Sequence, residues 1–196
     1  SYRFLRRVWN FGVKLGAMTA TADDAGASEK DIKALRLEIH TVLKQVDYDY
    51  QRMQYNTVVS GGMKLLNALE DFKGGSSIAS LEALREGFGI LIRCIYPATP
   101  HIAHALWGEL GYAAAQGDLL DAPWPEVDAA ALQQDEIELM LQINGKLRGS
   151  VTVSATADKA AIEAAALATE AFVKQAAGAA PKKVIVVPGR LVNIVV

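Results

Sequence analysis

The sequence predicts two domains: an all-α helical bundle followed by a small α+β domain with a four-stranded sheet. Apolar residues recur at helical spacing through the first part of the chain. Near the C-terminus, short apolar segments are separated by Gly-containing turns, which is typical of hairpins. A stretch rich in Gly, Pro and acidic residues separates the two patterns and indicates a linker. We therefore place the bundle at residues 1–117, the linker at 118–136 and the α+β domain at 137–196.

The first two helices follow from apolar periodicity and a capping residue. Residues 1–16 carry apolar side chains near helical spacing, which predicts an amphipathic helix. Small and polar residues then form a loop from Thr19 to Ala27. Ser28 is the expected N-cap of a second helix that runs through Leu43.

Three more helices complete the predicted bundle. The third extends from about Tyr50 to Phe72, where two glycines follow. Ser77 is expected to cap the fourth, which continues to Ile95. Thr99 and Pro100 then open a short helix over 101–110, because proline is favoured at the first helical position.

The first C-terminal hairpin, residues 137–153, predicts its own loop length. Side chains alternate along a strand, so Ile137, Leu139, Leu141 and Ile143 share one face. A two-residue Asn144-Gly145 loop would pair Ile143 with Lys146 and set apolar residues against polar ones. We therefore expect a three-residue loop with a bulge, with Leu147 on the apolar face and both Lys146 and Arg148 on the polar face.

The rest of the α+β domain reads as helix and then two strands. An Ala-rich stretch over 156–177 predicts one or two helices, with Gly178 as the C-cap. The strands expected at 184–187 and 191–196 are apolar on both faces. Both are therefore placed in the middle of the sheet.

The charge of the chain is unevenly distributed. The net charge of −2 divides into +4 over residues 1–14, −9 over 15–136 and +3 over 137–196. A polyanion should therefore meet the first helix and the C-terminal domain. No apolar run reaches the length of a membrane span, and the single Cys94 excludes an internal disulfide, so we expect a cytoplasmic protein without a membrane partner.

No catalytic or metal-binding constellation is expected. His101 and His104 share a helix face, but no further ligand falls at metal spacing. The group His40, Asp47, Asp49 and Glu38 resembles an ordinary charged helix face as much as an acid–base site. A buried, inert Cys94 thiol is favoured over a nucleophile, and close helix packing is favoured over a phosphate loop for Gly87-Phe88-Gly89.

Cationic and amide side chains near turns and on the first helix are the candidates for RNA contact. An aromatic, cationic and amide cluster from Tyr48 to Asn56 can stack on unpaired bases, and the tyrosines can equally be boundary residues of the core. The cations can equally be solvated surface groups. The candidate residues are Arg3, Arg6, Arg7, Arg52, Asn144, Lys146, Arg148, Lys182, Lys183, Arg190 and Asn193.

Several motifs together resemble the C-terminal part of the bacterial-type leucyl-tRNA synthetase family. The bundle motifs are residues 3–9, 54–57, 66–69, 96–111 and Trp124-Pro125, which the valine and isoleucine enzymes share. Residues 142–148 and 183–196 are similar to the small C-terminal domain of the leucine enzymes. Neither a cysteine-rich end, typical of the isoleucine enzymes, nor a coiled coil, typical of the valine enzymes, is found.

The resemblance implies a fragment that positions tRNA(Leu) for ATP-dependent leucylation and editing by upstream domains of the same chain. It implies ATP and Mg in the parent enzyme and neither in this fragment. We expect a monomer that binds tRNA and no DNA. The alternatives are the anticodon-binding region of a valine or isoleucine ligase, a protein-interaction bundle, and an autonomous enzyme that uses His101 and His104.

Overall fold

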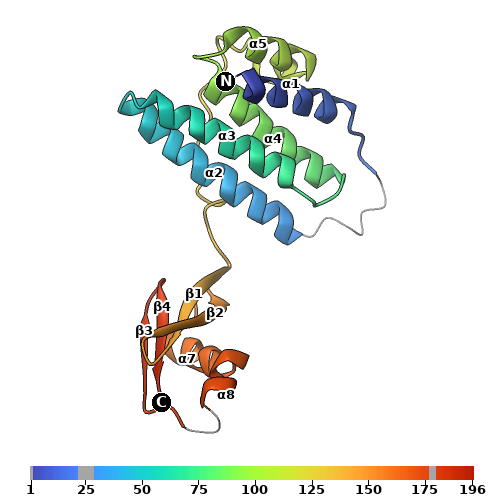
Figure 1. Cartoon of the computed structure of the whole chain (residues 1–196). Helices are drawn as coiled ribbons and strands as arrows, with labels where there is room; N and C mark the ends of the chain where they lie inside the picture. Colours follow the sequence, from blue (N-terminus) through green and yellow to red (C-terminus); the bar gives the residue numbers. More distant parts are fainter. Residues whose placement is uncertain (1, 22–28, 177–179) are drawn as a thin grey trace. The chain divides into compact units, whose positions relative to one another are not determined.

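The computed structural model describes residues 2–21, 29–176 and 180–196 and divides into two compact units, residues 1–133 and 134–196. Unit 1 is a bundle of α-helices and unit 2 is a four-stranded sheet with helices on one face (Figure 1). The predicted fold class is confirmed. Ser28 and Gly178, the expected caps, lie outside the described residues.

The helices of unit 1 pack around one apolar core. Their bounds are α1 Tyr2–Ala17, α2 Glu29–Gln51, α3 Tyr55–Asp71, α4 Ile78–Ile95, α5 Pro100–Glu109 and α6 Tyr112–Gln116. Val8, Leu43, Leu65 and Leu91 bring one residue each from α1 to α4 into this core. No helix in the described part of the chain is both long and apolar enough to cross a membrane.

Capping and close packing explain two local features of α4. The Ser77 hydroxyl accepts a hydrogen bond from the Ser80 backbone N–H at 2.8 Å, which confirms the predicted cap. A Cβ atom on Gly87 would stand 2.4 Å from Ile39 Cδ1, so the absence of a side chain lets α4 pack closely against α2. Gly87 therefore serves helix packing and not phosphate binding, as the sequence favours.

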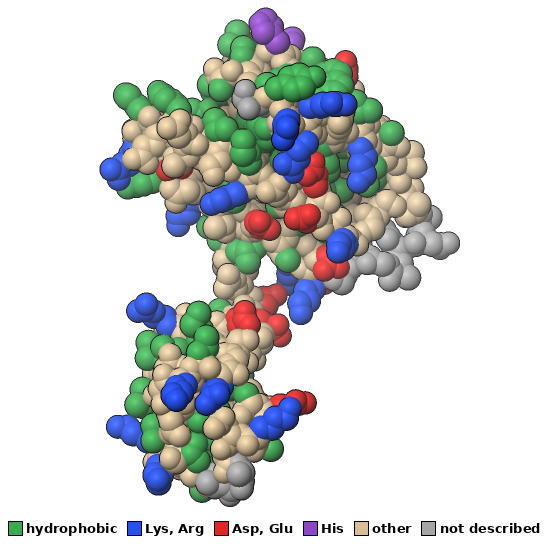
Figure 2. All heavy atoms as spheres, viewed as in Figure 1, with side chains coloured by type: hydrophobic (Ala, Val, Ile, Leu, Met, Phe, Trp, Pro, Cys, Tyr) green, Lys and Arg blue, Asp and Glu red, His purple; other side chains and the backbone are tan. Residues whose placement is uncertain are grey.

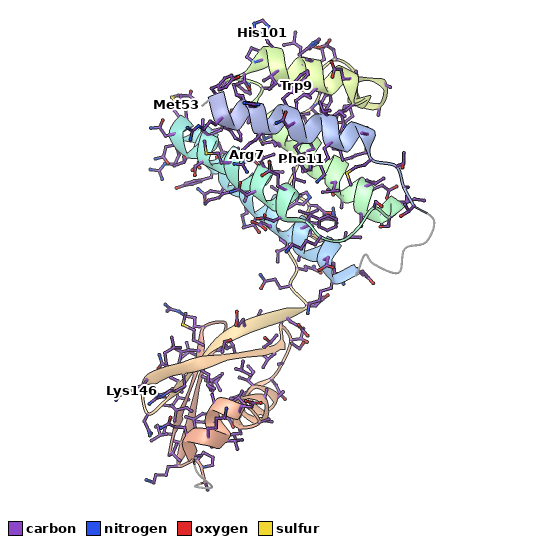
Figure 3. All side chains as sticks on the ribbon, turned by 45° about the vertical axis from the view of Figure 1, so that its right-hand side comes forward. Arg7, Trp9, Phe11, Met53, His101 and Lys146 are labelled. Carbon is purple, nitrogen blue, oxygen red and sulfur yellow. The ribbon has the colours of Figure 1, made fainter. Side chains whose placement is uncertain are left out.

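The turn between α2 and α3 lies later in the chain than predicted. Tyr50 belongs to the end of α2, and α3 begins only at Tyr55. The reversal is made at Met53, which adopts a left-handed backbone with φ 56°. The Gln54 N–H donates to the Asp49 carbonyl at 2.8 Å and closes the turn. Met53 marks this helical corner in Figure 3.

An ionic network fixes the segment that follows α6. The Arg36 guanidinium donates to both Glu86 oxygens, at 2.8 and 3.0 Å, and to Asp128 at 2.7 Å. His40 is 2% exposed, and its Nδ1 accepts from the Asp128 N–H at 3.0 Å. Its Nε2 therefore carries the proton and donates to Glu86 at 2.9 Å.

Most of the expected linker lies on the bundle. Leu119 and Ala131 are buried, and the Trp124 indole donates to Asp47 at 2.5 Å. We call residues 118–131 the strap. Residues 118–133 belong to unit 1 and residue 134 onward to unit 2, so the segment expected as linker is divided between the two units.

Unit 2 holds a mixed sheet in the order β2-β1-β4-β3. The elements are β1 Glu136–Ile143, β2 Lys146–Ser154, α7 Lys159–Leu167, α8 Glu170–Ala176, β3 Lys183–Val187 and β4 Leu191–Val195. β1 and β4 are parallel neighbours in the middle. The prediction that 191–196 is central is confirmed, but the same prediction for 184–187 is wrong, because β3 is an edge strand.

Helices cover only one face of this sheet, so apolar side chains on the other face of the edge strand stay exposed. Leu139, Leu141, Val192 and Ile194 point into the core beneath α7 and α8. The other face carries no helix (Figure 1), and Ile185 of β3 remains exposed on that strand. Apolar character on both faces therefore does not indicate burial here.

The first hairpin reaches the expected core face by a different route. The loop has two residues, Asn144 with φ 51° and Gly145 with φ 75°, and Ile143 pairs with Lys146. These left-handed conformations suit the twist of a two-residue hairpin turn. A register shift between Leu141 and Gln142 then skips Arg148, so the predicted three-residue loop is wrong, and the bulge lies in the strand pairing instead of in the loop.

The two-residue loop places Leu147 and Lys146 on faces other than those predicted. Gln142 pairs with Leu147, which is therefore on the open face and 60% exposed instead of in the core. Lys146 stands opposite Ile143, so it does not share the polar face as predicted. Arg148 lines a shallow hollow on the open face beside Met140.

The ionic network predicts an acid-dependent stability. Burial alone would raise the pKa of Glu86, but hydrogen bonds from His40 and Arg36 lower it to about 2. A depressed folded-state pKa stabilises the fold above pH 4.5, and this contribution is lost as the pH falls toward 2. We expect Glu86→Gln to cost on the order of 2 kcal/mol at pH 7 and much less near pH 2, measured by urea unfolding.

Glu82→Gln is the matched control, since Glu82 is an exposed carboxylate one turn earlier on α4. It should leave the unfolding free energy within about 0.5 kcal/mol of the parent at both pH values. An equal loss for Glu86→Gln at pH 7 and at pH 2 would contradict the role given to this carboxylate.

The boundary between the units predicts the first site of proteolysis. Ala131 is buried and Asp128 is ion-paired, whereas Gln133 and Gln134 are exposed. We expect limited proteolysis to cut first within residues 132–134, because exposed backbone between folded units is easily bound by a protease. Mass spectrometry should find the two units as early products. Earlier cutting at Met53, the exposed turn between α2 and α3, would count against this boundary.

Candidate nucleic-acid interface

The cations of unit 2 gather at two ends of the sheet. β1 and β4 run parallel, with Met140 beside Leu191 and Ile143 beside Ile194. The Asn144-Gly145 turn therefore lies at the C-terminal end of β4, and the turn that carries Arg190 lies at the opposite end. Figure 2 shows Lys and Arg side chains spread over the viewed face of unit 2.

Three lysines share the end that contains the first hairpin turn. Lys146 follows the turn and points away from the sheet in Figure 3. Lys183 pairs with Val195, and the Lys182 N–H donates to the Val195 carbonyl at 2.8 Å. We call Lys146, Lys182 and Lys183 the lysine end. Lys146 is on one edge strand and Lys183 on the other, so they are separated by three strand spacings, roughly 14 Å.

The other predicted residues of unit 2 have different environments. The Asn144 side-chain oxygen accepts from the Val196 N–H at 3.1 Å, and the Asn193 oxygen accepts from the Gly145 N–H at 3.2 Å. These two amides fix the turn to β4. Arg148 lies at the bulge, and Arg190 is exposed in the β3–β4 turn, which Gly189 permits with φ 69°.

The predicted residues of α1 also separate into two groups. Arg7 donates to Asn67 at 2.7 Å and forms an ion pair with Glu70, which joins α1 to α3. The hydrogen bond to Glu70 raises the pKa of Arg7. Arg3 and Arg6 are exposed on the same helix. They stay candidates for RNA contact, and Arg7 has a structural role.

The aromatic cluster at the α2–α3 corner forms two separate sets of contacts. The Arg52 guanidinium lies 5.3 Å from the centroid of the Tyr48 ring. Tyr50 instead contacts Tyr55 and, from the strap, Trp124. The sequence places Tyr48, Tyr50 and Tyr55 in one segment, but only the fold brings Trp124 to them.

The residues weighed as catalytic have other partners. His40 belongs to the ionic network, Asp49 accepts from Gln45 at 2.8 Å, and Asp47 accepts from Trp124. His104 lies 3.2 Å from Asp118, and His101 points into solvent in Figure 3. Among residues 2–21, 29–176 and 180–196, no three His, Cys, Asp or Glu side chains are arranged to hold a metal ion.

The Cys94 thiol is inert for a physical reason. It is fully buried in α4, and burial raises its pKa to about 12. A thiol with this pKa stays protonated near neutral pH and is a poor nucleophile. The expected burial of this cysteine is confirmed.

Sequence reasoning missed the residues that organise unit 1. Arg36 and Glu86 are 50 positions apart, and Arg36 and Asp128 are 92 apart. Two further arginines, Arg85 and Arg93, lie over the rings of Tyr112 and Trp107 and donate to backbone carbonyls. No local spacing in the sequence indicates these pairs.

The comparisons with known proteins cover the whole chain. Residues 33–164 match the family described as the anticodon-binding domain of tRNA ligase. The leucine--tRNA ligase of Polaromonas naphthalenivorans (strain CJ2) is 80% identical over 202 residues, which covers 100% of this chain and 23% of that protein. The leucine--tRNA ligase of Paracidovorax citrulli (strain AAC00-1) is 71% identical, again over 100% of the chain and 23% of the relative.

A solved structure has the same fold. It is the ternary complex of Agrobacterium radiobacter K84 agnB2 LeuRS-tRNA-LeuAMS, with a TM-score of 0.72 at 24% identity, covering 98% of this chain and 24% of that one. The chain thus spans about a quarter of the length of these relatives. The resemblance to bacterial leucyl-tRNA synthetases is confirmed across the chain.

Proposed function

Since the chain belongs to the anticodon-binding domain family of tRNA ligases, we propose that it is the tRNA-binding C-terminal portion of a leucine--tRNA ligase. It positions tRNA(Leu) for leucylation and editing by the rest of the enzyme. The observation that carries this proposal is the 80% identity to a leucine--tRNA ligase over the full chain. We place the parent enzyme in the cytoplasm, where it acts as a monomer.

The chemistry of the reaction belongs to other parts of the parent enzyme. In the described residues, the histidines and carboxylates weighed as catalytic are engaged in structural contacts or point into solvent, and the one thiol is inert. ATP and Mg are therefore assigned to the remaining three quarters of the relatives' length. This fragment supplies binding and orientation only.

Electrostatic contact with phosphates is the binding mode that unit 2 supports best. The lysine end offers three exposed ammonium groups next to a turn held rigid by Asn144 and Asn193. Gly145 keeps the turn free of side-chain bulk. Arg148, Arg190 and, on α1, Arg3 and Arg6 are further exposed cations. Such contacts position an RNA without reading its bases.

A protein-interaction bundle is the second candidate, and exposed apolar residues on α1 favour it. Trp9 and Val13 are exposed beside Lys14 on that helix. This surface and the lysine end are on different units, so the two candidates are separable. Binding to tRNA that depends on salt and on unit 2 supports the first and not the second.

The phosphate contacts predict a smaller salt dependence in a lysine-end variant. We expect Lys146→Ala with Lys183→Ala to weaken tRNA(Leu) binding and to reduce the slope of log affinity against log salt by up to about 0.9 per contact. The measurement is filter binding or anisotropy at several salt concentrations. A phosphate contact carries little information about the base, so the affinity of the variant for other RNAs with the bent shape of tRNA should fall about equally.

Lys159→Ala with Lys174→Ala removes the same charge from the helical face and is the matched control. Both residues are exposed and each pairs with a glutamate four positions away. In the control, the slope of log affinity against log salt should stay closer to that of the parent chain. If the two double variants lose affinity and slope equally, unit 2 attracts RNA by net charge alone and the lysine end is not a site.

Catalytic independence of the fragment is the other prediction. We expect the pure 196-residue chain to catalyse no leucine-dependent exchange of pyrophosphate into ATP, because the adenylate-forming groups are assigned elsewhere. The full-length ligase serves as the positive control. Pyrophosphate exchange by the fragment above a buffer blank would contradict the assignment of the chemistry to the rest of the enzyme.

A further inference from the structure

Three aromatic rings meet at the corner between α2, α3 and the strap. The Trp124 and Tyr50 ring centroids are 5.3 Å apart at an interplanar angle of 88°, and those of Tyr50 and Tyr55 are 6.2 Å apart at 70°. We call Tyr50, Tyr55 and Trp124 the aromatic corner. Trp124 is 41% exposed and Tyr55 59% exposed, so the outer two rings offer surface to a ligand.

The polar atoms of the Tyr50 and Trp124 rings already have partners. The Tyr50 hydroxyl donates to the Cys94 carbonyl at 2.7 Å, and the Trp124 indole N–H donates to Asp47. The backbone beside Trp124 is held as well, because Arg93 donates to the Pro123 carbonyl at 3.1 Å. The rings are therefore fixed in place, and what they offer is an aromatic surface and not a hydrogen-bond donor.

A hollow adjoins these fixed rings. Its lining is Asp47, Tyr50, Gln51, Pro97 and Trp124, and its volume is about 450 Å³. Pockets of this size accept small planar ligands. The flat, apolar walls come from Trp124 and Pro97, and the polar rim comes from Asp47 and Gln51.

We propose that the aromatic corner binds one unpaired nucleobase of the RNA, stacked on the Trp124 indole with its polar edge toward Asp47 and Gln51. This inference rests on the proposed function, since it takes the RNA as the partner. Stacking on a fixed ring is favourable for every base, so the site adds affinity with little sequence discrimination.

Charge distinguishes a base from a phosphate at this site. The Asp47 carboxylate is in the wall of the hollow and would repel a phosphate. The same carboxylate accepts hydrogen bonds from the exocyclic amines of adenine, cytosine or guanine. Stacking should therefore contribute to binding without adding to its salt dependence, unlike the contacts of the lysine end.

The simpler role of Trp124 is to hold the strap against α2. That role and base binding both predict a loss of stability on removal of the indole. Only base binding predicts a loss of RNA affinity when the protein stays folded. The two roles are therefore separated by measuring tRNA binding and unfolding on the same variants.

The test compares three single substitutions in the 196-residue chain with tRNA(Leu) as the probe. Trp124→Leu keeps an apolar side chain and removes the stacking surface. Trp124→Phe keeps a ring, and Leu120→Ala is the control, since Leu120 is an exposed apolar residue on the same strap. We expect a loss of about 5- to 100-fold for Trp124→Leu, a smaller loss for Trp124→Phe and none for Leu120→Ala, all at the parental salt slope.

Fluorescence gives a measurement that needs no destabilising change. Stacking of a base on Trp124 should quench the indole emission of the parent as tRNA is added, and Trp124→Phe should lack that part of the quenching. Trp107 is buried and remains as an internal reference, and any quenching of the exposed Trp9 is common to the parent and to Trp124→Phe. Quenching that is identical in the parent and in Trp124→Phe would overturn the assignment.

The outcomes also separate this inference from the proposed function. If Trp124→Leu binds tRNA with normal affinity while the lysine-end variant binds more weakly, base binding is overturned and the proposed function is not. The aromatic corner then only holds the strap against α2. A parent chain that binds no tRNA at any salt concentration overturns both. A loss of affinity with a changed salt slope would show that Trp124 acts through phosphate contacts, which contradicts stacking.

Discussion

The double hydrogen bond between Arg36 and Glu86 is the interaction on which the arrangement of α2, α4 and the strap depends. It joins α2 to α4, and the same guanidinium holds Asp128 of the strap. His40 completes the connection, because it donates to Glu86 and accepts from the Asp128 backbone. Charged groups this close to a core are costly to desolvate, and each is compensated by a partner. The strap, and with it Trp124, is held by these ionic contacts as well as by the burial of Leu119 and Ala131.

The two proposals assign different modes of RNA binding to the two units. Unit 2 has exposed cations on a small sheet, which suit phosphates. Their attraction to RNA is electrostatic, and its range becomes shorter as the salt concentration rises. Unit 1 has a rigid aromatic corner with an acidic neighbour, which suits a base at contact distance. The two proposed modes differ in their dependence on salt, and neither needs a particular base sequence.

The sequence predicted the helices and the sheet well because their signals are local. Apolar periodicity and Ser77 define the helices of the bundle, and Cys94 in an apolar helix predicts an inert thiol. Errors arose where a non-local or conformational choice decides the outcome. Met53 adopts a left-handed backbone that no propensity suggests, and the bulge at Arg148 lets a two-residue loop reach the register expected of a three-residue one. The same holds for the candidate site. The sequence shows which residues are cationic, whereas the structural roles of Arg7, Asn144 and Asn193 depend on partners 48 to 63 positions away.

The placement of β3 at the edge of the sheet has a consequence for how the protein behaves at high concentration. A short strand with Ile185 and Val187 exposed and one backbone edge unpaired is a template for intermolecular cross-β association. Lys182 and Lys183 stand at its start, and like charges in neighbouring copies repel when two such edges align. Lys182 and Lys183 therefore disfavour edge-to-edge association, and neutralising them should make the chain more prone to self-assembly.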